Sequence, residues 1–199
     1  MGRKLALALG VGLLVLWGLG GSAAAAASGA EANRTEGIID QVEFIGGYGS
    51  ASLPEGEYQT LLLIVHLGKE IGHFIPALRG HRGKLSVFLE PQYNPVLKPA
   101  SDSEFGLGVG IQYAYPLTDV ISAYILGVTG PHNITVDTTH QASGFNFASA
   151  VGAGFYVYLT KNVAVNLGYR YRHISNADIR KPNDGIDSHI GLMGIAYFF

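Results

Sequence analysis

The chain has 199 residues, enough for one domain, and it contains no cysteine. The absence of thiols excludes disulfides, thiol catalysis, a thiolate metal site and a bacterial lipoprotein anchor. Charged residues make up only 14% of the chain, glycine occurs 28 times, and the net charge is −2. This balance gives no reason to expect a nucleic-acid partner.

The first residues have the organisation of an export signal. "MGRK" carries positive charge, "LALALGVGLLVLWGLGG" is apolar, and "SAAAAASGA" supplies small residues for cleavage. A membrane anchor is the alternative, but the apolar segment is shorter than the roughly 20 residues that a spanning helix needs. We therefore expect a signal peptide over 1–27, cleaved within 25–30, and a mature domain over 28–199 outside the cytoplasm.

The mature region alternates with a period of two, which is typical of β-strands. In residues 105–115, Phe, Leu, Val, Ile and Tyr alternate with Gly, Gln and Ala. A soluble sandwich usually places Lys, Glu and Thr on its second face, whereas glycine and alanine suit the crowded interior of a small barrel whose apolar face meets lipid. We expect eight strands, at about 37–49, 58–69, 83–94, 104–115, 120–129, 144–159, 163–175 and 187–199.

The connections and the last residues favour a membrane barrel over a soluble β-protein. "PLTD" and "TKN" are tight turns, whereas "PVLKPASDSE", "GPHNITVDTTHQAS" and "NADIRKPNDGI" predict long external loops. Residues 69–82 do not fit this alternation and predict a small excursion. The final strand ends on an aromatic residue, like the assembly signal of outer-membrane proteins. The sequence thus predicts an all-β, eight-stranded antiparallel transmembrane barrel that crosses the bacterial outer membrane in multiple passes.

The end of the seventh predicted strand carries a polar group on the lipid-facing side. Odd positions 163–171 are the large apolar ones, and His173 and Ser175 continue that parity. Because both termini of such a barrel are periplasmic, this strand ends at the cell exterior, at the level of the outer leaflet. Polar side chains cost little free energy there compared with the middle of the bilayer.

The predicted hairpin adds an acid to this pair. In a near-symmetric hairpin Asp187 lies opposite His173, and directly opposed residues share a face. Asp187, His173 and Ser175 can then act as acid, base and nucleophile, since serine is a weak nucleophile until a histidine accepts its proton. The alternative is a set of ordinary interfacial polar residues.

"RHISNADIRKPNDGID" resembles the signature of the PagL family, the outer-membrane lipid A 3-O-deacylases. Its members carry His-x-Ser-Asn at the end of the seventh strand, followed by a loop containing Pro-Asn and by an acidic residue. The resemblance covers about 37–199 and is strongest over 169–199. It implies an eight-stranded barrel with a Ser-His-Glu triad on its outer surface, at the outer leaflet.

The resemblance implies that Ser175 is the nucleophile and His173 the general base. Asp187 stands where the family usually has Glu and is one methylene shorter. Asn176 and Asn183 match the family's asparagines, and the sequence leaves open whether they stabilise the oxyanion or support the loop. Where the family often has Ala-Gly, this chain has Ala177 followed by an aspartate, a departure with no explanation in the sequence.

The implied reaction is hydrolysis of the 3-hydroxyacyl ester at position 3 of lipid A, with lipopolysaccharide as the substrate and no cofactor or metal. A non-enzymatic structural barrel and a phospholipase-like esterase are the alternatives, and a homodimer stays open. Several side chains allow two interpretations. Tyr169, Tyr171, Phe145 and Phe147 can guide an acyl chain or form an aromatic girdle, and Arg180 and Lys181 can bind phosphates or simply be solvated. Arg170 and Arg172 should point inward and pair with carboxylates such as Glu43 or Glu90.

Overall fold

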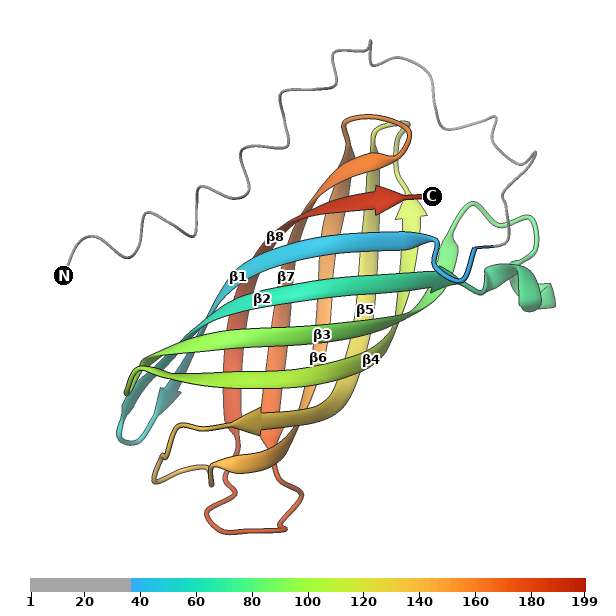
Figure 1. Cartoon of the computed structure of the whole chain (residues 1–199). Coiled ribbons are helices and arrows are strands. Elements are labelled where there is room, and N and C mark those ends of the chain that lie inside the picture. The colour runs from blue at the N-terminus through green and yellow to red at the C-terminus, as the bar shows by residue number, and fades with distance from the viewer. Residues whose placement is uncertain (1–36) are drawn as a thin grey trace.

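A computed structural model describes residues 37–199, so the predicted signal peptide and cleavage site lie outside the described residues. Eight antiparallel strands close into a barrel, each paired with its neighbours in the sequence and the last paired with the first (Figure 1). The eight-stranded barrel predicted from the alternation is confirmed. The strands are β1 (Gln41–Leu53), β2 (Gly56–Glu70), β3 (Lys84–Lys98), β4 (Asp102–Pro116), β5 (Ile121–Ile134), β6 (Gly144–Tyr158), β7 (Val163–Ser175) and β8 (Ile186–Phe198).

Several strands are longer than predicted. β3 and β4 leave only residues 99–101 between them, so the long loop expected over "PVLKPASDSE" is wrong, and β5 continues to Ile134 instead of ending near 129. The sequence misled because proline is usually a loop signal. Here Pro95 pairs with Ser103 and Pro131 pairs with Phe147 inside the ladders, and proline is tolerated in a strand where no backbone donor is required.

The irregular segment between β2 and β3 is a short excursion, as expected. It contains two single 3-10 turns, η1 (Gly72–Phe74) and η2 (Pro76–Leu78), at the end of the barrel where the chain also terminates (Figure 1). Within residues 37–199, no helix is long and apolar enough to cross a membrane.

The outer wall is apolar and the lumen is filled, as the alternation predicted. Exposed side chains with outward parity include Phe44, Val109, Ile125, Val151 and Met193, each more than half exposed. A barrel surface of this kind is stable only against hydrocarbon, because monomeric soluble proteins rarely expose contiguous apolar patches of this extent.

Glycines make room for large aromatic side chains inside the barrel. A methyl group added to Gly154 would lie 2.5 Å from the Tyr124 hydroxyl, and one added to Gly110 would lie 2.7 Å from a ring carbon of Phe88. Both rings are almost fully buried. The glycine-rich face therefore reflects close packing in the lumen rather than flexibility of the strands.

Two ion-pair clusters link β7 to the opposite wall of the lumen. The Arg170 guanidinium donates two hydrogen bonds to Glu90, at 2.6 and 2.7 Å, and the Arg172 guanidinium donates two to Glu104, at 2.7 and 3.1 Å. The inward direction of both arginines is confirmed. Glu90 is a partner as predicted, but Glu43 is not: it accepts hydrogen bonds from Gln41, Asn166 and Tyr156 instead.

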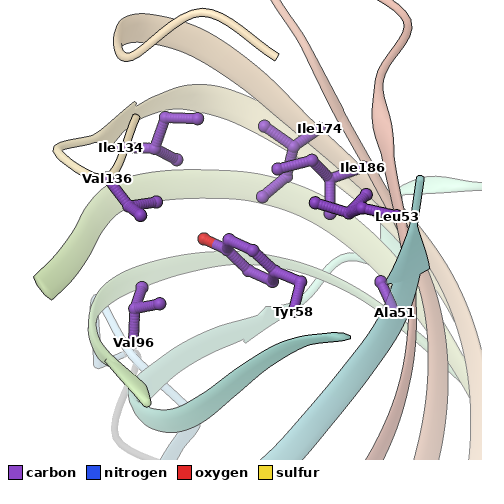
Figure 2. Packing of buried hydrophobic residues seen from close by; sticks show 8 residues of the cluster. All are labelled: Ala51, Leu53, Tyr58, Val96, Ile134, Val136, Ile174 and Ile186. Carbon is purple, nitrogen blue, oxygen red and sulfur yellow. The ribbon is translucent and has the colours of Figure 1, made fainter. Parts of the chain in front are cut away.

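An apolar cluster fills the lumen beside the ends of β7 and β8. Figure 2 shows Ile174 and Ile186 packed side by side with Leu53, facing Tyr58 across the cluster. Ile174 and Ile186 are directly paired across the two strands, and each is fully buried. Burying such a side chain stabilises a fold by about 1.5–3 kcal/mol. This packing holds the strand ends that carry the predicted site residues.

Candidate active site

His173 and Asp187 form a hydrogen-bonded pair on the outer wall. They are directly opposed across β7 and β8, as the hairpin geometry predicted, and His173 Nδ1 lies 2.8 Å from Asp187 Oδ1. Both side chains are about half exposed, at 45% and 52%. With Nδ1 held by the carboxylate, Nε2 is the ring nitrogen that can accept a proton. The shorter aspartate therefore reaches the imidazole.

Two serines compete for the position beside this imidazole. Ser175 lies on the same face two residues further along β7, where Cα atoms are roughly 6.5–7 Å apart. Ser149 lies directly opposite His173 on β6. The Ser149 hydroxyl is 2.7 Å from that of Thr129, so it already has a partner on β5. The sequence pointed only to Ser175, because the pairing of β6 with β7 brings Ser149 to this place.

Asn176 and Asn183 both support the β7–β8 loop in the structure. The fully buried Asn176 side chain donates to the Arg180 carbonyl at 2.9 Å. Asn183 accepts from the Asn176 backbone amide at 2.7 Å and donates to Asp178 at 3.2 Å. Of the two roles that the sequence left open for these asparagines, their hydrogen bonds favour loop support.

The turn that follows Ser175 and Asn176 has an unusual backbone. Ala177 and Asp178 both adopt left-handed conformations, with φ of 52° and 63°. For non-glycine residues this costs of order 1–3 kcal/mol each, and such strain is concentrated at functional sites. Within residues 37–199, neither backbone amide has a hydrogen-bond partner. Successive amides in a turn of this kind can form a concave site for an anion.

The two cations of the loop have partners within it. The Lys181 ammonium lies 2.7 Å from Asp178 and holds the pKa of that carboxyl below its ordinary value. Arg180 donates to the Ser143 carbonyl. The carboxylate that departs from the family pattern thus has a local role: it binds the lysine and Asn183.

Two residues that the sequence did not single out support the site. Gly185, with a φ of +85°, lies against the His173 ring, and an added methyl group would be 2.5 Å from Cε1. Gln141, from the β5–β6 loop, accepts a hydrogen bond from the Gly185 amide at 2.9 Å. Glycine in a turn was a readable signal for Gly185, but nothing local marks Gln141.

The outer wall beside the site is aromatic and contains a depression. Phe145 and Phe147 meet edge to face at 5.1 Å, and Phe147 pairs directly with Ser175. An open depression of about 630 Å³ runs from Phe145 across β5, β4 and β3 to β2, lined mainly by apolar side chains. On the other side of the site, the Tyr169 hydroxyl lies 2.6 Å from Nδ1 of His189.

Comparison with protein families agrees with the signature. The model of the family described as lipid A 3-O-deacylase (PagL) matches residues 66–196, about two thirds of the chain. The chain belongs to the PagL family. The match includes β7, β8 and the loop between them, and hence every predicted site residue.

Solved structures show the same fold. A crystal structure of the outer membrane enzyme PagL covers 77% of this chain and 97% of its own, with a TM-score of 0.58 and 21% identity. Neisserial surface protein A (NspA) covers 80% of this chain and 96% of its own, with a TM-score of 0.59 and 17% identity. No curated protein sequence gives a significant match. The homodimer that the sequence left open gains no support here.

Proposed function

We propose that this barrel is a lipid A 3-O-deacylase that works as a serine esterase. The observation that carries the proposal is the His173–Asp187 hydrogen bond on the outer wall, beside Ser175 on the same face. A triad in the lumen would have no access to a membrane lipid, whereas this one faces the leaflet that holds lipopolysaccharide. Membership of the family supports the same substrate.

In the proposed reaction, the Ser175 hydroxyl attacks the ester carbonyl and His173 Nε2 accepts its proton. Asp187 stabilises the imidazolium and holds the ring in the tautomer whose Nε2 is unprotonated. The collapsing intermediate releases the sugar alkoxide, which takes the proton from His173 and leaves an acyl-serine. Water then attacks the acyl-serine, again with His173 as base, and a 3-hydroxy fatty acid leaves.

We assign the oxyanion donors to the backbone amides of Ala177 and Asp178. Both are free of other partners in the described residues and follow the nucleophile directly. A preorganised donor of this type contributes about 3–4 kcal/mol of transition-state stabilisation. The apolar depression that ends at Phe145 supports an acyl-chain path along the wall.

The test compares lipid A from cells that express the wild type, Ser175→Ala and Ser149→Ala. Mass spectrometry should show loss of one 3-hydroxyacyl group with the wild type and Ser149→Ala, and none with Ser175→Ala. Loss of deacylation only in Ser149→Ala would move the nucleophile to β6. An unchanged lipid A mass with the wild type would favour a structural barrel, and cleavage of phospholipid vesicles but not of lipopolysaccharide would favour a phospholipase.

A further inference from the structure

Gln141 is a fully buried polar side chain in the β5–β6 loop, residues 135–143. This loop and the β7–β8 loop project together from the end of the barrel that lies away from the C terminus (Figure 1). They are joined through the backbone: Ala142 donates to the Pro182 carbonyl at 2.9 Å, and Asp184 donates to the His140 carbonyl at 3.0 Å. Gln141 lies at the centre of this junction, bridged to Asn183.

The hydrogen bonds of Gln141 connect it to both sides of the candidate site. Its Oε1 accepts from the Gly185 amide at 2.9 Å, and Gly185 lies against the His173 ring. Its Nε2 donates to Asn183 Oδ1 at 3.0 Å. That same oxygen accepts from the Asn176 backbone amide, next to Ser175. One side chain therefore reaches the supports of the base and of the nucleophile.

The orientation of the Gln141 amide follows from backbone groups that have only one role. Asn183 Oδ1 must be an acceptor because a backbone amide donates to it. Asn146 Oδ1 must also be an acceptor, because the Asn146 amino group donates to the carbonyls of Ala142 and Gly144. Nε2 of Gln141 donates to both oxygens, at 2.7 Å to Asn146 and 3.0 Å to Asn183. Only an amide satisfies all three partners.

We infer that Gln141 is a positioning residue for the proposed reaction: it holds Gly185 against the imidazole and Asn183 against the backbone beside Ser175. The inference rests on the proposed function. A productive site tolerates displacements of only about 0.5 Å, so loss of this brace should lower turnover without removing substrate binding. A residue that merely supports the fold would instead affect the barrel as a whole.

The experiment uses the full mature barrel in detergent micelles with lipid A as the substrate. Gln141→Ala removes the brace, and Gln141→Glu keeps its shape but places carboxylate oxygens against two acceptor oxygens. Asp137→Asn, in the same loop, is the matched control, because its side chain is exposed and has no hydrogen bond in the described residues. Folding of each variant is checked by its mobility on an unheated gel.

Both Gln141 variants should lose at least about tenfold in kcat, with KM within about threefold of the wild type and the control unchanged. For Gln141→Glu, the ratio of its kcat to that of the wild type should rise as the pH falls, since protonation restores one donor. A kcat within twofold of the wild type in Gln141→Ala overturns the inference, as does a loss shared by Asp137→Asn.

A second readout separates this inference from the proposed function. If the wild type hydrolyses no lipid ester, the proposed function fails, and nitrogen-15 spectra of the His173 ring and the Gly185 amide decide the positioning role. Shifts in both signals in Gln141→Ala, but not in Asp137→Asn, support the brace. Unchanged signals in Gln141→Ala overturn it.

Discussion

The Glu104 cluster offers a quantitative test of how the lumen holds β7. Glu104 is fully buried and accepts hydrogen bonds from Tyr58 at 2.6 Å and Asn94 at 2.9 Å, in addition to the two from Arg172. The same carboxylate lies 3.1 Å from His132 Nε2. Glu104→Gln replaces an acceptor with a donor that faces the buried guanidinium. Breaking a buried pair in this way costs about 3–5 kcal/mol of unfolding free energy, because it leaves an uncompensated charge.

The assay is urea unfolding of the barrel in lipid vesicles, followed by circular dichroism and gel mobility. Tryptophan fluorescence is unsuitable because the only tryptophan of the chain, Trp17, lies in the predicted signal peptide. Arg172→Met and the double variant complete a thermodynamic cycle. The double variant should lose at least about 1.5 kcal/mol less than the sum of the single losses, since removing both charges leaves neither unpaired.

Glu57→Gln is the control for a surface ion pair. Glu57 lies 2.6 Å from Lys98, but the two side chains are 61% and 52% exposed, and pairs of this type contribute little. No measurable change in stability is expected. The reasoning would be refuted if Glu104→Gln unfolded within about 1 kcal/mol of the wild type, or if the losses in the cycle were additive.

Three further predictions concern the site and the lumen. Asp187→Asn should lower kcat by about 10³–10⁴ by allowing the wrong imidazole tautomer, whereas Asp187→Glu should stay within about tenfold; equal activity of both variants in a lipid A assay would contradict the triad. Gly185→Ala should lower kcat at least about tenfold by displacing the imidazole, while Gly56→Ala, at a φ of +135° with open space around it, should affect stability alone; matched kcat values would exclude the contact. Gly154→Ala should cost about 1–3 kcal/mol through overpacking, and Gly127→Ala, with nothing within 4 Å, should be near neutral; urea midpoints that do not differ would rule out a crowded lumen.

The sequence alone determined the fold class, the direction of each strand face and the pairing of His173 with Asp187. The reason is that the side-chain period of a strand is two, so parity sets the face, and a hairpin brings nearby residues into register. The same logic correctly directed Arg170 and Arg172 into the lumen. Local patterning therefore contains the barrel and most of the candidate site.

Only the tertiary structure decided which distant residues meet. Glu104 as the partner of Arg172, Ser149 opposite His173, and Gln141 beside Gly185 all depend on the register between strands and on contacts between two loops. These contacts join residues more than 20 positions apart, and no local period reports them. Closure of the barrel fixes them, because it sets the register of every strand at once and brings the β5–β6 loop against the β7–β8 loop.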